Sequence, residues 1–180
     1  MNTVEYISKT INTLTQKHRS RDPFELCDAL GIRVRYMQLK QIKGFYFYQS
    51  RIRTIVLNSE LGEETQRILC AHELGHACLH SEMLSNMRTL HEYEPYNAKN
   101  TAEYEANIFA SELLIPDESI KELFQSDGKS FYSLAKELSV PAEFIDFKLR
   151  VMKAKGYDIN IPYLAQSDFL KRELKETQKF

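Results

Sequence analysis

The order of apolar and polar residues predicts two helices followed by three strands in the first third of the chain. Apolar residues recur at helical spacing over residues 3–17, which predicts an amphipathic helix. Asp22 and Pro23 begin a second helix, because proline suits a first turn, and Gly31 ends it. Alternating apolar residues then predict strands, with a hairpin among them. The predicted strands are 32–36, 45–48 and 52–57.

Helices are predicted for most of the remaining chain. Residues 63–80 are apolar on most sides, as in a helix buried in a core, and Pro116 ends a helix predicted over residues 101–115. Residues 81–99 show no clean periodicity, so we expect a long loop that borders a cleft. Three more helices are predicted at 119–124, 131–138 and 142–155, before a tail of mixed charge at 166–180.

These elements predict a single mainly helical α+β domain with a small sheet. We assign it residues 1–165, including a C-terminal helical part at about 117–155. The helices at 131–138 and 142–155 have the spacing of a helix-turn-helix, but Phe144 and Phe147 suit a packed helix better than one lying on phosphates. The last strand leads almost directly into residue 63, so it is either an edge that pairs with an extended peptide or an interior strand.

Composition and charge place this domain in solution. A net charge of −1 over 180 residues offers no general affinity for nucleic acid or for an anionic membrane. The sequence contains neither the apolar region of a signal peptide nor an apolar stretch long enough to span a membrane. Cys27, Cys70 and Cys78 are odd in number and lack a CxxC spacing, which favours reduced core thiols. We therefore expect a cytoplasmic protein.

The buried helix carries His72-Glu73-Leu74-Gly75-His76, which has the spacing of a metal site. On a helix His72 and His76 lie one turn apart on one face, so both imidazoles can reach one ion. Glu73 leaves the helix about 100° away from His72. It is therefore placed to hold and deprotonate a water on the metal, as in a hydrolase. Three of the five histidines fall within residues 72–80, which argues against a chance match.

Two neighbours of this motif carry further expectations. Gly75 costs a helix about 1 kcal/mol against alanine, so we expect another segment to pass close to it. His80 lies on the same stripe as His72 and His76. It is either a further ligand or a residue that closes the helix end, where a donor side chain meets free carbonyls.

The helix over residues 101–115 supplies the second half of the site. Glu103, Ala106 and Asn107 share one face, and the small alanine lets that face approach the histidine helix closely. We expect Glu103 to be the third ligand and Asn107 to contact a histidine from behind the metal. A role for Glu103 at the helix start is the alternative. Glu105 points elsewhere on this helix, so we expect its loss to leave metal binding nearly intact.

The predicted loop at 81–99 holds three side chains that suit the stabilisation of an oxyanion or the binding of substrate. They are His91, Tyr93 and Tyr96. Surface aromatics that pack the loop down are the alternative for each of them.

Residues 68–76 together with residues 103–116 resemble the ImmA/IrrE family of zinc metallo-endopeptidases. The resemblance covers about residues 29–149, and Asn58 matches the family's usual strand-end asparagine. It implies a gluzincin-like core, with Glu103 as third ligand, four residues before the asparagine of the Glu-x-x-Ala-Asn pattern. Characterised members cleave helix-turn-helix repressors, which implies such a repressor as the substrate.

The sequence thus predicts a zincin-like endopeptidase with one Zn²⁺ per chain on His72, His76 and Glu103, and Glu73 as general base. We expect a protein substrate, without direct nucleic-acid or membrane contact. The strand that ends at Leu57 is expected to pair with the cut segment. A DNA-binding or antitoxin-like regulator with a structural or inactive metal site is the main alternative. A zinc hydrolase of small molecules is the other, and it requires a deep closed pocket.

Overall fold

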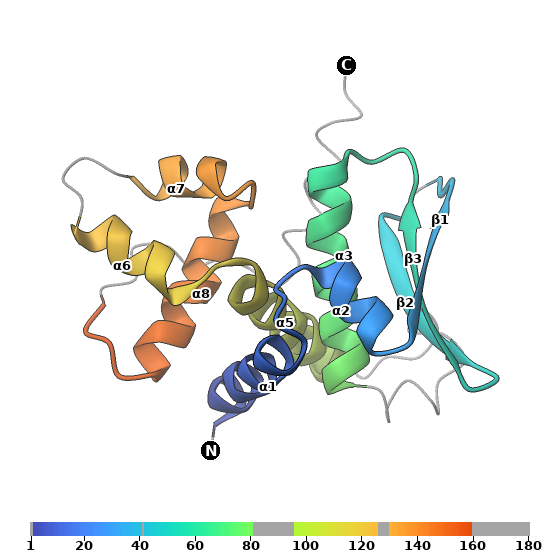
Figure 1. The fold of residues 1–180 in the computed structure, drawn as a ribbon, viewed down its shortest axis with the longest axis horizontal. Helices are drawn as coiled ribbons and strands as arrows, with labels where there is room; N and C mark the ends of the chain where they lie inside the picture. Colours follow the sequence, from blue (N-terminus) through green and yellow to red (C-terminus); the bar gives the residue numbers. More distant parts are fainter. Residues whose placement is uncertain (1, 41, 81–95, 126–129, 160–180) are drawn as a thin grey trace.

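The computed structural model describes residues 2–40, 42–80, 96–125 and 130–159. A three-stranded sheet lies at one side of the molecule, with α2 and α3 against it, while α6, α7 and α8 lie beyond α5 on the opposite side (Figure 1). This arrangement is the mainly helical α+β fold that the sequence predicts. None of the helices in the described ranges combines the length and apolar composition needed to cross a bilayer.

The sheet has β3 in the middle. Its strands are β1 (Ile32–Met37), β2 (Gly44–Gln49) and β3 (Ile52–Asn58), in the order β1-β3-β2. β3 is parallel to β1 and antiparallel to β2. Ser50 and Arg51 join β2 to β3 with φ of 51° and 65°, the left-handed values that a tight hairpin turn needs. The predicted hairpin is confirmed, and β3 is an interior strand.

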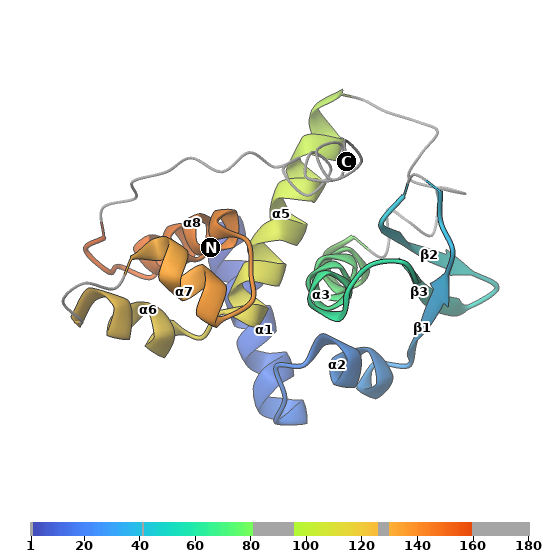
Figure 2. The ribbon, with the colours of Figure 1, turned by 90° about the horizontal axis from the view of Figure 1, so that it is seen from above.

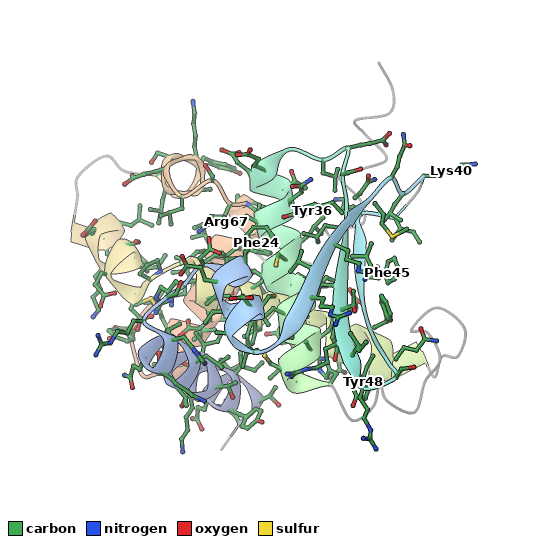
Figure 3. All side chains as sticks on the ribbon, turned by 45° about the vertical axis from the view of Figure 1, so that its right-hand side comes forward. Phe24, Tyr36, Lys40, Phe45, Tyr48 and Arg67 are labelled. Atoms are coloured by element: carbon green, nitrogen blue, oxygen red, sulfur yellow. The ribbon has the colours of Figure 1, made fainter. Side chains whose placement is uncertain are left out.

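Both faces of β3 are covered. Ile55 and Leu57 are fully buried on the face toward the helices. Val56, on the other face, is paired with Phe45 in the register of β2, and the rings of Phe45 and Phe47 lie 5.8 Å apart along that strand. The Phe45 side chain projects away from the helices in Figure 3. Aromatic side chains of β2 therefore shield an outer face of the sheet on which no described helix packs.

The two N-terminal helices begin at side-chain caps. α1 spans Thr3–His18 and α2 spans Pro23–Ala29. Asn2 accepts a hydrogen bond from the Glu5 backbone N–H while the Glu5 carboxylate accepts one from the Asn2 backbone N–H, which completes a capping box. Asp22 caps α2, with Pro23 in its first turn. Both predicted helices are confirmed.

Helix α3 (Glu63–Leu79) lies between the sheet and α5 (Tyr96–Leu114), as Figure 2 shows by viewing α3 along its axis. Every residue of α3 from 68 to 77 is buried, as the apolar residues on most sides of this helix predict. α5 begins before residue 101, so the prediction of a loop over residues 81–99 is wrong for 96–99, where backbone hydrogen bonding continues the helix. Residues 81–95 lie outside the described ranges.

Three helices follow the end of α5 near Pro116. They are α6 (Asp117–Gln125), α7 (Phe131–Glu137) and α8 (Ala142–Ala154). α8 packs against α5, and Phe144 and Phe147 are fully buried. The prediction that the last helix is packed into the protein, as its aromatic residues suggest, is confirmed.

A buried ion cluster joins α8 to the rest of the fold. Lys148, which is 0% exposed, donates hydrogen bonds to Glu112 and Asp117, both at 2.5 Å. Lys155 donates to Glu112 at 2.7 Å and to Asp117 at 3.0 Å. Ser8 of α1 donates to Glu112 at 3.0 Å. The cluster therefore ties α1, α5, α6 and α8 together.

Candidate metal centre

The histidines of α3 lie one turn apart and turn the same ring atom toward one point. His72 and His76 are 6% and 3% exposed. Their Nε2 atoms are 3.2 Å apart, and the two rings meet edge to face with centroids 4.8 Å apart. Two imidazole nitrogens this close, with neither ring stacked on the other, leave space for a shared cation.

Glu103 of α5 completes a triangle of ligand atoms. Its carboxylate oxygens lie 3.6 Å from His72 Nε2 and 3.7 Å from His76 Nε2. An ion about 2.0–2.1 Å from each of three tetrahedral ligands sets them about 3.3–3.4 Å apart. Among the described residues, these three form the group with metal-ligand spacing. Two imidazoles and a carboxylate suit several divalent transition ions, zinc among them.

Asn107 holds His72 from behind. Its side-chain oxygen lies 2.9 Å from His72 Nδ1, and the asparagine is fully buried. An amide oxygen only accepts, so His72 Nδ1 carries the proton and Nε2 keeps its lone pair toward Glu103. The placement of Asn107 next to a histidine is the one that the helical face predicts.

Gly75 marks the closest approach of α3 to α5. A Cβ added at Gly75 would lie 3.1 Å from Phe109 Cβ and 3.2 Å from Ala106 Cα. The segment expected to pass close to this glycine is therefore α5 itself. Because Glu103 and Asn107 are on the same helix, the small residues at this contact set how near they come to the histidines.

The carboxylates give the site a negative potential. Burial lowers the pKa of His72, but the hydrogen bond that the protonated ring donates to Glu103 and the charges of Glu73 and Glu103 outweigh it, and the net pKa is raised. Glu73 follows His72 in α3 and is 8% exposed. A site that stabilises a proton on a buried imidazole also stabilises a metal cation in its place.

His80 closes the end of α3 as expected, because it is the C-cap residue and its backbone N–H donates to the His76 carbonyl oxygen. Its side chain, however, lies outside the ligand triangle. Its ring is behind His76, with the two Nδ1 atoms 3.2 Å apart, so it is on the far side of His76 from the ligand triangle. Its Nε2 lies 2.8 Å from Glu105 Oε2 and not at a carbonyl of the helix end. Glu105 is not part of the ligand triangle, as its place on the helix predicts, but its long side chain reaches His80 at the end of α3, a contact that was not predicted.

The predicted oxyanion or substrate residues are not placed. His91 and Tyr93 lie outside the described ranges. Tyr96 is the first residue of α5, and its side chain also lies outside them. Their roles remain predictions.

The three thiols are separate from the ligand triangle. Cys27 and Cys70 are fully buried with sulfurs 3.8 Å apart, and the hydrogen bond between them, together with burial, raises the pKa of Cys70. Burial raises the pKa of Cys78 to about 12. Thiols with raised pKa values are poor nucleophiles and poor metal ligands near neutral pH, as expected for core residues.

Comparison with known proteins agrees with this geometry. The family model of the IrrE N-terminal-like domain, a peptidase family, matches residues 27–150, which include the whole ligand triangle. This chain belongs to that family. It is thus a metallopeptidase of the ImmA/IrrE type, and its family implies a bound metal ion.

Three relatives illustrate the range of the family. The chain is 34% identical over 146 residues to uncharacterized immunity region protein 2 of Bacillus phage phi105, covering 79% of this chain and 88% of the relative. It is 26% identical over 148 residues to the metallopeptidase ImmA of Bacillus subtilis (79% and 83% covered). It is 33% identical over 128 residues to the radiation response metalloprotease IrrE of Deinococcus deserti, covering 68% of this chain and 44% of that protein.

Proposed function

We propose that this metallopeptidase is a zinc-dependent endopeptidase that cuts a helix-turn-helix transcriptional repressor at one site. The observation that carries the proposal is the triangle of His72, His76 and Glu103 ligand atoms, contributed by two helices and backed by Asn107. His72, His76 and Glu103 hold one Zn²⁺ per chain. Two histidines and one carboxylate are a common protein ligand set of catalytic zinc, which leaves a fourth position for water or substrate.

Glu73 is the catalytic residue of this proposal. A divalent ion supplies Lewis acidity, which polarises the scissile carbonyl and makes water more acidic. Glu73 takes the proton from the attacking water and delivers it to the leaving amine nitrogen, so that one water and one peptide bond give a carboxylate and an amine. Its place directly after His72 in α3 and its burial support this role.

In this proposal the substrate segment pairs with β2. Pairing of the substrate with β3 is excluded, because β3 forms hydrogen bonds to β1 on one side and to β2 on the other. Within the described residues β2 has one strand neighbour, β3, and it contacts α3, the helix that carries both histidines, whereas β1 contacts α2. An extended substrate segment adds to the free edge of β2, next to the metal ligands.

A repressor as substrate is supported by the sequence resemblance and by the names of the relatives. The relative from phage phi105 is named for an immunity region, and the Bacillus relative is named as a metallopeptidase. The protein acts in the cytoplasm, without membrane or direct nucleic-acid contact. The DNA-binding alternative needs an exposed recognition helix, whereas Phe144 and Phe147 of α8 are buried.

The test is to incubate the zinc-loaded protein with a repressor encoded beside its gene and to follow intact masses. We expect two fragments whose masses sum to the repressor plus one water. Glu73→Gln should cut about 10²–10⁴-fold more slowly. Glu63→Gln, the same change at an exposed position of the same helix, should cut at the wild-type rate.

Two outcomes would contradict the proposal. Cleavage by Glu73→Gln at the wild-type rate would remove Glu73 from the chemistry. Intact neighbouring repressors, together with efficient digestion of unrelated unfolded proteins, would indicate a general peptidase instead.

A further inference from the structure

A second layer of side chains lies behind one of the two histidines. His80 is the C-cap residue of α3, and its ring Nδ1 is 3.2 Å from Nδ1 of His76. Its other nitrogen, Nε2, is 2.8 Å from Oε2 of Glu105 on α5. His80 is 7% exposed, and Glu105 lines a groove with Tyr6 and Leu79. A continuous path of polar contacts therefore leads from His76 to a carboxylate at the surface.

These contacts permit one arrangement of protons on the two neutral rings when His76 binds a cation. The Nε2 of His76 faces Glu103 and must be unprotonated to bind, so its Nδ1 carries the proton. That proton is donated to Nδ1 of His80, which must then be an acceptor. The His80 proton is consequently on Nε2, where it is donated to the Glu105 carboxylate. Every donor in the path meets an acceptor.

We propose that His80 and Glu105 are positioning residues that orient His76 and strengthen it as a metal ligand. This inference rests on the metal centre of the proposed function. A carboxylate that accepts a hydrogen bond from an imidazole polarises it, and His80 passes this effect to the Nδ1–H of His76. His72 has a different hydrogen-bond partner on its Nδ1, the neutral amide of Asn107, and no carboxylate takes part in that contact. The two histidine ligands are thus held by unlike partners.

Zinc affinity of the metal-free protein, measured by competition with a chelating indicator, tests the path. His80→Ala should weaken binding about 10–100-fold, the usual effect of losing a partner behind a ligand. His80→Asn keeps an acceptor near the position of Nδ1 but is too short for Glu105, so it should restore part of the loss. Glu105→Gln keeps a hydrogen-bond acceptor without the charge and should lose less than His80→Ala.

The loss of zinc affinity in a double variant distinguishes a connected path from two independent effects. In the double variant His80→Ala/Glu105→Gln the second change should add nothing, because the link to His76 is already broken. The matched control is Glu118→Gln, which removes the same charge from an exposed position on α6 and should bind zinc as the wild type does. The visible absorption of the Co²⁺-loaded protein should change in His80→Ala and not in the control, since it reports the ligand field.

Four results would overturn the inference. Wild-type zinc affinity in both single variants would do so, as would losses that add in the double variant. Weaker binding that is matched by lower thermal stability of the metal-free protein, with an unchanged Co²⁺ spectrum, would reduce His80 and Glu105 to structural roles. A wild-type protein that binds no metal would overturn the proposed metal centre as well, whereas the first three results leave that centre intact.

Discussion

Replacing Gly75 with alanine tests whether the packing of α3 against α5 sets the geometry of the metal centre. The new methyl carbon would lie 3.1 Å from Phe109 Cβ and 3.2 Å from Ala106 Cα. Carbon atoms in good contact are about 3.5–4.0 Å apart. The backbone at Ala106 cannot turn aside as a long side chain does, so α5 has to retreat by a few tenths of an ångström and take Glu103 with it.

The expected change in unfolding free energy of the Gly75→Ala protein has two opposing parts. Alanine favours the helix by about 1 kcal/mol over glycine. Overpacking a close helix contact costs about 1–3 kcal/mol. The net loss of unfolding free energy in the metal-free protein is therefore small, about 0–2 kcal/mol. Zinc affinity should fall further, by at least about tenfold, because metal–ligand distances tolerate only about ±0.2 Å.

Thermal unfolding of the metal-free protein and competition for zinc against a chelator measure the two effects separately. The control is Gly62→Ala at the start of α3, where an added Cβ meets nothing within 4 Å. That variant should keep wild-type zinc affinity. A Gly75→Ala protein that is more stable than the wild type and binds zinc equally well would refute the claim that this contact sets the site.

The buried ion cluster supplies two more predictions. Lys148→Met should cost about 3–5 kcal/mol of unfolding free energy by chemical denaturation, because it leaves Glu112 buried without its closest cation. The control Lys153→Met, at an exposed position of the same helix, should cost less than about 0.5 kcal/mol. Equal losses in the two variants would contradict the burial argument. Burial raises the pKa of Asp117, but its hydrogen bonds to Lys148 and Lys155 outweigh this and hold the pKa below its usual value. This stabilisation is present above the pKa of Asp117 in the unfolded chain and is lost as pH falls through the lower pKa of the folded protein. Asp117→Asn should therefore lose less stability than the wild type when pH falls below about 4. The same pH dependence of stability in both proteins would contradict this prediction.

Local periodicity is sufficient to predict which side chains of each helix point toward the metal centre. His72 and His76 share a helix face because they are four residues apart, and Glu103 shares one with Asn107 for the same reason. The small residue at Gly75 predicts a close neighbour, and the structure places α5 there. These features depend on spacing along a single helix or on one close contact, which a sequence displays directly.

Features that depend on how separate elements meet are not predicted. β3 is central because it pairs directly with β1 as well as with β2, although β2 lies between β1 and β3 in the sequence; chain order does not specify this arrangement. The contact of Glu105 with His80 depends on how α3 crosses α5 and on the reach of a long side chain. Lys148 is a residue type that is normally exposed, and its burial requires the distant carboxylates of Glu112 and Asp117.

Metal content tests the central claim most directly. Native mass spectrometry of the protein dialysed after loading with zinc should show one Zn²⁺ per chain in the wild type and in His18→Ala, which changes a histidine of α1 remote in sequence from the ligand triangle. His76→Ala should show almost none, because one histidine and one carboxylate are too few ligands for tight binding. Full occupancy in His76→Ala would contradict the assignment of the metal centre.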